Sequence, residues 1–229
     1  MERPFDIQIE KLKTKLIKMC SLVDEQVEFA IRAVEEENKN LASIVLERDE
    51  KVDKYDVKVD RICQKLFALN QPVAMDLRLI MSAIKINANL ERIGDLAVNI
   101  AHNAFEMEKR SDFYNRIGFS EAASLAREMI KNSIDSFIER DAELGRKVLL
   151  TDDKLDEMVM NSRNLLIQIM KENVDNIDAA MKFNTIFQSL ERLGDHAVNI
   201  AEEVYFIVNA ESIKHRSEEP PIDDDFGGY

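Results

Sequence analysis

At 229 residues, the chain is long enough to form one large domain or two small ones with buried cores. Its composition, with 33% charged and 45% hydrophobic residues, six glycines, four prolines and no tryptophan, is typical of helix bundles. The formal net charge of −13 argues against nucleic-acid binding, which depends on Lys and Arg displacing counterions from phosphates, and makes metal cations or basic protein surfaces better candidate partners.

Three helices are predicted in the first half of the chain, over residues 5 to 38, 41 to 70 and 73 to 109. The polar run Asn38-Lys39-Asn40 marks the first break. Asn70-Gln71-Pro72 marks the second, because proline disfavours helix in the residue before it and suits the first turn of the helix that it starts. No convincing strand pattern is visible.

Three further helices are predicted in the second half, over residues 119 to 140, 142 to 173 and 176 to 210. The acidic stretch from 217 to 229, with its Pro and Gly residues, is expected to be disordered. The predicted domains are therefore a first three-helix unit, a second three-helix unit and an acidic tail, at residues 1–112, 117–212 and 213–229.

The two halves are homologous. ERIGDLAVNIA at residues 91–101 recurs as ERLGDHAVNIA at residues 191–201, with nine identities in eleven positions. Upstream, DEKVD at 49–53 matches DDKLD at 152–156, so the offset changes from 100 to 103 residues. A repeat of this length is too long for a solenoid unit, and each half is better interpreted as a bundle with its own core. The predicted fold class is all-α, a tandem repeat of two three-helix bundles with six helices.

Acidic residues four positions apart occur on the second and third helices of each half, and the spacing puts two carboxylates on one helix face. The candidate metal ligands are Asp49 with Asp53, Glu91 with Asp95, Asp152 with Asp156, and Glu191 with Asp195. A single pair is weak evidence, because 44 acidic residues in this chain give about 8 such pairs by chance. Asp56 with Asp60 is interpreted as a chance pair of this kind.

The four pairs differ from chance pairs because they recur in both halves and have apolar neighbours. Like charges at this spacing repel, so a helix gains no stability from placing them together in both halves. On a helical wheel, Ile80, Ile84 and Ala88 lie within about 40° of Glu91, so the acids are expected to interrupt an apolar stripe. If the second and third helices of each half pack side by side, four carboxylates converge in each bundle.

An all-oxygen site of this kind suits hard cations such as Mg²⁺, Ca²⁺, Mn²⁺ or iron, and suits Zn²⁺ less well because no Cys or His cluster accompanies it. The predicted cofactors are divalent or trivalent metal ions, with iron, manganese, magnesium and zinc left open.

Two other features of the third helices allow alternatives. Gly94 and Gly194 cost about 1 kcal/mol each relative to Ala inside a helix, which a small-residue packing contact or room around an ion would offset. Arg78, Lys85 and Arg92 share one stripe. The stripe is either a solvated basic face or a contact for an acidic partner or for the other half.

Cellular location is inferred from the cysteines and from hydropathy. Cys20 and Cys63 have apolar neighbours, and a chain of this size needs no disulfide, so we expect reduced core thiols in a cytoplasmic protein. No apolar run of about 18 residues is present, and the first ten residues lack the apolar segment of a signal peptide. The chain is expected to be peripheral to a membrane complex at most.

Enzymatic alternatives find little support. A ferritin-like di-iron oxidase places His three residues after Glu on facing helices, whereas Gly94 and Gly194 occupy those positions here. Neither a phosphate-cradling Gly-rich loop nor a nucleophile with a base is visible. The chain is therefore not expected to be an enzyme. A purely structural helical adaptor, with the acids solvated and empty, remains the main alternative.

Both copies of the third-helix motif match the pattern ERxGDxAxNIA of the PhoU family, and the run from Pro72 to Asp95 is similar to the family's first repeat. The resemblance extends over residues 5 to 212. It implies a negative regulator that acts when phosphate is plentiful and links the phosphate ABC transporter to a sensor histidine kinase. It also implies a homodimer, and multinuclear metal clusters held by the acidic pairs given above.

Overall fold

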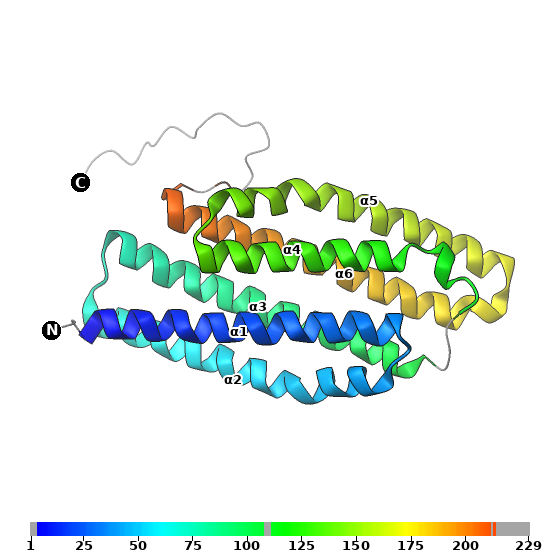
Figure 1. The fold of residues 1–229 in the computed structure, drawn as a ribbon, viewed down its shortest axis with the longest axis horizontal. Helices are drawn as coiled ribbons and strands as arrows, with labels where there is room; N and C mark the ends of the chain where they lie inside the picture. The colour runs from blue at the N-terminus through cyan, green and yellow to red at the C-terminus, as the bar shows by residue number, and fades with distance from the viewer. Residues whose placement is uncertain (1–3, 108–110, 212, 214–229) are drawn as a thin grey trace.

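The computed structural model describes residues 4–107, 111–211 and 213, which form six long helices and no strand (Figure 1). In the first half these are α1 (Pro4–Glu35), α2 (Lys39–Asn70) and α3 (Ala74–Glu106). In the second half they are α4 (Phe119–Glu139), α5 (Ala142–Glu172) and α6 (Ile177–Asn209). Two short 3-10 helices, η1 (Tyr114–Arg116) and η2 (Val174–Asn176), precede α4 and α6.

The predicted fold class and all six helices are confirmed, with boundaries that shift by up to three residues. The third helix was expected to reach residue 109, but it ends at Glu106 because Met107 has an extended backbone. Residues 108–110 lie outside the described part of the chain. So do residues 214–229, which contain the predicted disordered tail.

Local chemistry explains why the helices begin and end where they do. The Asn38 side chain caps α2 by accepting hydrogen bonds from the backbone N–H groups two and three residues on, at 3.1 and 3.3 Å. Asp141, at the equivalent position in the second half, caps α5 in the same way at 2.9 and 3.0 Å. At the end of α2, Gln71 adopts a left-handed conformation directly before Pro72. The residues that start and end these helices are therefore present in the sequence of each half.

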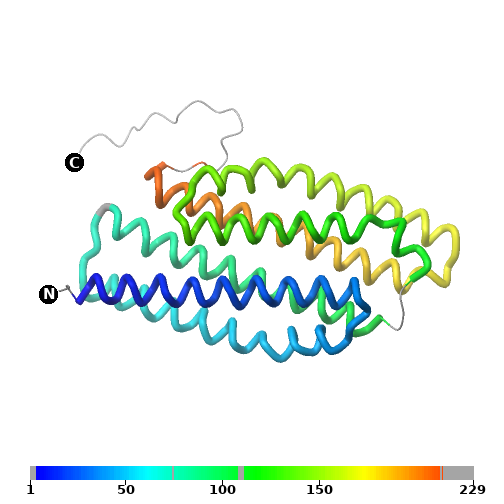
Figure 2. The backbone as a smooth tube through the Cα atoms, viewed as in Figure 1, coloured from blue at the N-terminus to red at the C-terminus, as the bar shows by residue number. Residues whose placement is uncertain are grey.

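Each half is a three-helix bundle, and the two bundles lie side by side with their long axes aligned (Figure 2). The third helices, α3 and α6, pack against each other in the middle of the molecule. They run antiparallel, since Ser82 near the start of α3 meets Glu203 near the end of α6. The buried side chains of both halves form one continuous core, so the bundles share a core along this pair.

Polar contacts cross the boundary between the halves. Glu203 is only 2% exposed, and its carboxylate accepts hydrogen bonds from Ser82 Oγ and Lys85 Nζ, both at 3.0 Å. On the face shown in Figure 1, Arg127 of α4 pairs with Glu28 of α1 at 2.5 Å. Lys85 of the basic stripe thus contacts the other half, although its side chain stays about half exposed.

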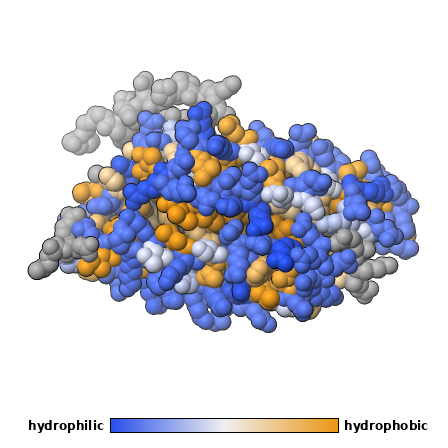
Figure 3. All heavy atoms as spheres, in the orientation of Figure 1, coloured by the Kyte–Doolittle hydropathy of each residue, from blue (hydrophilic) through white to orange (hydrophobic). Residues whose placement is uncertain are grey.

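The face that Figure 3 shows is largely hydrophilic, and hydrophobic side chains gather on it between α1 and α4. Within the described ranges, no helix is both long enough and apolar enough to cross a bilayer. Cys20 and Cys63 are both buried and unpaired with each other, as expected for core thiols.

Candidate metal centre

The acidic pairs lie where two helices of each half approach closely. α2 packs along α3 in the first half, and α5 packs along α6 in the second. A Cβ atom on Gly94 would lie 3.4 Å from Val52 Cγ1 of α2, and one on Gly194 would lie 2.7 Å from Leu155 Cδ2 of α5. The same atom on Gly194 would lie 3.3 Å from Asp152 Oδ1. The two glycines therefore let the neighbouring helix, with its acids, come close.

In the first half, the pairs from α2 and α3 are near enough to influence each other's titration. The pKa of Asp49 is raised, first by burial and then by the charges of Asp53 and Asp95. Burial also raises the pKa of Glu91, with further repulsion from Asp95, while Arg92 opposes the shift. We refer to Asp49, Asp53, Glu91 and Asp95 as the first acidic cluster.

The second half repeats the arrangement, and there the rise in pKa is larger. The pKa of Asp152 is raised from 3.8 to about 6 by burial, followed by repulsion from Asp156 and Asp195. Burial likewise raises the pKa of Asp156 and that of Asp195, and Arg192 opposes the shift of Asp195. Asp152 Oδ1 is buried and has no hydrogen-bond partner in the part of the chain that is described. We refer to Asp152, Asp156, Glu191 and Asp195 as the second acidic cluster.

Basic side chains neutralise part of each cluster. Arg92 places Nε 3.3 Å from Glu91 Oε2 and Nη1 3.0 Å from Asp95 Oδ2. In the second cluster, Glu191 faces Arg163 of α5, with 3.8 Å between Oε2 and Nη1. Among residues 4–107, 111–211 and 213, no three or more His, Cys, Asp or Glu side chains stand in an arrangement that could hold a metal ion. The carboxylates are brought near one another but are not gathered on one point.

The acids were expected to interrupt an apolar stripe, and the structure buries this stripe only in part, with Ile80 fully buried. The Glu91 and Asp95 side chains are 26% and 42% exposed, and Glu191 is 38% exposed. Ile84 and Ala88, predicted to share the stripe, are exposed too. The cause is that this face of α3 lies at the margin of the core, because Ile80 and Leu90 are fully buried while Ile84 and Ala88 are exposed. Partial burial is enough to raise the pKa values but leaves the side chains room to reorient.

Sequence reasoning missed an extension of the first cluster. Asn87 is 1% exposed, and its Nδ2 donates to Asp56 Oδ1 at 2.7 Å and to Asp60 Oδ1 at 3.3 Å. Its Oδ1 has no partner among the described residues. The signal was the position of Asn87, one turn before Glu91 on the same face of α3. Asp56 and Asp60 are thus ordered by α3, contrary to their interpretation as a chance pair.

The two clusters are not equivalent. At the offset of 103 residues, Val159 and Arg163 of α5 take the places of Asp56 and Asp60. At these two positions the first half has carboxylates, and the second half has an apolar side chain and a guanidinium group. The donor set of each cluster, all oxygen with partly buried and mutually repelling carboxylates, is of the chemical type that hard cations take, but among the described residues the carboxylates do not converge on one point.

Comparison with known proteins is consistent with the doubled architecture. The family model described as PhoU domain matches residues 16–104 and again 119–204. A "Phosphate-specific transport system accessory protein PhoU homolog" from Pseudomonas putida is 32% identical over 218 residues, which cover 94% of this chain and 84% of the relative. The homolog of the same description from Aquifex aeolicus is 34% identical and covers 91% and 95%.

Solved structures show the same fold. The crystal structure of PhoU from Pseudomonas aeruginosa has a TM-score of 0.87 and 32% sequence identity, covering 90% of this chain and 100% of the other. The phosphate transport system regulatory protein PhoU from Streptococcus pneumoniae has a TM-score of 0.83 at 22% identity, with coverage of 91% and 99%. The second likeness bears on the fold alone.

Proposed function

Because the chain belongs to the PhoU family, we propose that it is an accessory protein of a phosphate-specific transport system that represses phosphate uptake and the phosphate-starvation response. The observation that supports this proposal is the match of the family over both halves, together with relatives described as accessory proteins of that system. Regulation here needs protein contacts and no chemical reaction. The proposed partners are the phosphate ABC transporter and its sensor histidine kinase, met by a homodimer at the cytoplasmic side of the membrane complex.

We further propose that the acidic clusters bind metal ions. Asp49, Asp53, Glu91 and Asp95 would hold an ion between α2 and α3, and the second acidic cluster would do the same between α5 and α6. The bound cation supplies positive charge that offsets repulsion among the carboxylates. The partly exposed carboxylates can turn from Arg92 and Arg163 toward a shared ion, which would fix the spacing of the two helices that carry them.

A deletion and complementation experiment tests both parts. In rich phosphate, cells without the gene should express phosphate-starvation genes, and the wild-type gene should restore repression. A variant Asp152→Asn with Asp156→Asn should restore it poorly. Glu143→Gln with Glu157→Gln is the matched control, because it removes the same charge from exposed positions of α5.

The same proteins, purified, give the second readout. Elemental analysis should find metal in the wild type and the control, and less in the double variant of the second acidic cluster. Starvation genes that stay repressed after deletion would reject the regulatory role. Normal regulation with no metal bound to any of the three proteins would instead favour a metal-independent helical adaptor.

A further inference from the structure

A basic groove lies between α1 and α2, on the opposite side of α2 from the first acidic cluster. Its volume is about 440 Å³. Lys18 of α1 and three lysines of α2, Lys51, Lys54 and Lys58, line it, and Tyr55 forms part of its wall. The three α2 lysines are three and four residues apart, so they share one face of the helix.

Most of this positive charge is not neutralised by the protein. Glu25 also lines the groove, but its carboxylate is held by Arg48 at 2.5 Å. Glu50 pairs with Lys54 at 2.7 Å. The other three groove lysines have no carboxylate partner within the residues that the structure describes. In a chain with a net charge of −13, such a local excess of cations is unusual.

The Tyr55 ring contacts two lysines beside the groove, one from α1 and one from α2. Lys15 Nζ of α1 lies 5.6 Å from the centroid of the Tyr55 ring, and Lys58 Nζ of α2 lies 5.0 Å from it. Both distances fit cation–π attraction, which orients the ammonium groups without neutralising them. Lys15 does not line the groove itself, but its contact with Tyr55 brings a further cation to the groove wall.

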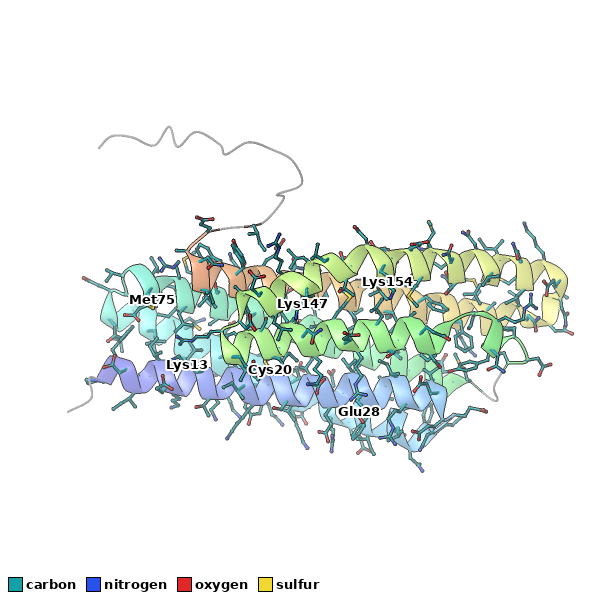
Figure 4. All side chains as sticks on the ribbon, turned by 45° about the horizontal axis from the view of Figure 1, so that its top comes forward. Lys13, Cys20, Glu28, Met75, Lys147 and Lys154 are labelled. Atoms are coloured by element: carbon teal, nitrogen blue, oxygen red, sulfur yellow. The ribbon has the colours of Figure 1, made fainter. Side chains whose placement is uncertain are left out.

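The second half contains the equivalent groove without the lysines. It lies between α4 and α5, has a volume of about 500 Å³, and keeps Ser124, Leu125 and Glu128 at the positions of Ser21, Leu22 and Glu25. At the offset of 103 residues, the groove lysines 18, 54 and 58 become Glu121, Glu157 and Asn161. Only Lys51 keeps its type, as Lys154, which Figure 4 labels on α5. The fold forms the groove with either set of residues, so helix packing does not require the lysines.

Neighbouring lysines on one helix face repel each other, and a ligand with several negative charges would relieve that repulsion. An ammonium group binds phosphate oxygens as a point charge, and several are needed where no Arg fork is present. The volume falls in the usual range for small-molecule sites, about 300–1,000 Å³. The groove is shallow and open to solvent, so it would hold a compact anion at the protein surface.

We propose that the α1–α2 groove binds a small soluble anion that carries several linked phosphate groups. The lysines hold the phosphate oxygens, and Leu22 and Tyr55 contact the remainder of the ligand. This site is separate from both acidic clusters and does not depend on the proposed regulatory function. It would make the first half of the protein, and not the second, responsive to a phosphorylated metabolite.

Titration calorimetry with inorganic triphosphate on chelator-treated, metal-free protein tests the proposal. The variant Lys18→Glu, Lys54→Glu and Lys58→Asn gives the groove the residues that the second half already accommodates. Wild-type protein should bind triphosphate more tightly than orthophosphate, with affinity that falls as salt rises. The triple variant should bind at least tenfold more weakly. The matched control Lys154→Gln, in the other groove, should bind as the wild type does, and circular dichroism should show the same helix content in all three.

Two further binding experiments distinguish a phosphate-bearing small molecule from other polyanions. Vesicles of phosphatidylglycerol, with phosphatidylcholine as the neutral comparison, report on lipid headgroups, and a poly-glutamate peptide reports on acidic protein segments. Lysine-dependent binding to either probe, with none to triphosphate, would overturn the proposal in favour of that partner. Triphosphate affinity that is equal in the wild type and the triple variant would also overturn it.

Discussion

Burial and neighbouring carboxylates both shift the pKa of Asp152 in the same direction. Both disfavour the charged form, and together they raise its pKa to about 6. Part of the side chain has no hydrogen-bond partner within the described structure. In the metal-free protein, the charge of Asp152 therefore costs stability, and the cost disappears either when a proton binds or when a cation does.

The stability of the metal-free protein should reflect this with a definite sign. Because the folded-state pKa lies above the ordinary value of 3.8, the folded state holds the proton more tightly between about pH 4 and pH 6. Stability from this group therefore falls as the pH rises through that window. Asp152→Asn should be more stable than the wild type at pH 7, by about 1 kcal/mol once solvent screening is allowed for, and nearly equal to it at pH 4.

Urea unfolding of chelator-treated protein at several pH values measures this difference. Glu157→Gln, at an exposed position of α5, is the matched control and should change the free energy of unfolding little at either pH. A wild-type advantage over Asp152→Asn at pH 7 would show that the carboxylate is stabilised by the fold, and would contradict the cost assigned to its charge.

At the scale of the helices, the close approach of α2 to α3 and of α5 to α6 gives the acidic pairs their proximity. The sequence predicted the positions of all four pairs, because helical spacing and the repeat are local patterns. It did not predict that Glu191 would face Arg163, since that contact joins two helices. Asn87 was missed for the same reason: its carboxylate partners lie about thirty residues earlier, on α2.

Alanine substitutions at the two glycines should distinguish the gain in helix propensity from the steric cost of a methyl group between two closely packed helices. Gly94→Ala places its methyl group in ordinary contact with Val52 and Gln26, so the gain in propensity of about 1 kcal/mol should largely survive. Gly194→Ala places it 2.7 Å from Leu155, a fully buried side chain that must shift, at a cost of about 1–3 kcal/mol. Urea unfolding should find Gly194→Ala the less stable variant, and equal stabilities would mean that α5 can move away from α6 at no cost.

At the scale of the whole molecule, the packing of α3 against α6 determines whether the two bundles unfold together as one unit. Sequence periodicity predicted six helices and two homologous halves, but nothing local indicated that α3 and α6 would run antiparallel in one shared core. Glu203 shows why. It directly follows Glu202 after the second motif and precedes the apolar run that begins at Val204, and the approach of α3 from the first half makes it a buried, hydrogen-bonded carboxylate.

The pair of Lys85 and Glu203 should therefore couple the halves energetically. A double-mutant cycle with Lys85→Ala and Glu203→Gln, followed by urea unfolding, should give a coupling of about 1–2 kcal/mol, because the carboxylate is desolvated although the lysine is half exposed. The matched control is Arg116 with Glu172 inside the second half, a pair at 2.8 Å with both side chains about half exposed. That cycle should give a clearly smaller coupling, because both charges of the pair are solvated and screened. Equal couplings in the two cycles would mean that the buried pair does not hold the bundles together, and that the apolar contacts of α3 with α6 do so alone.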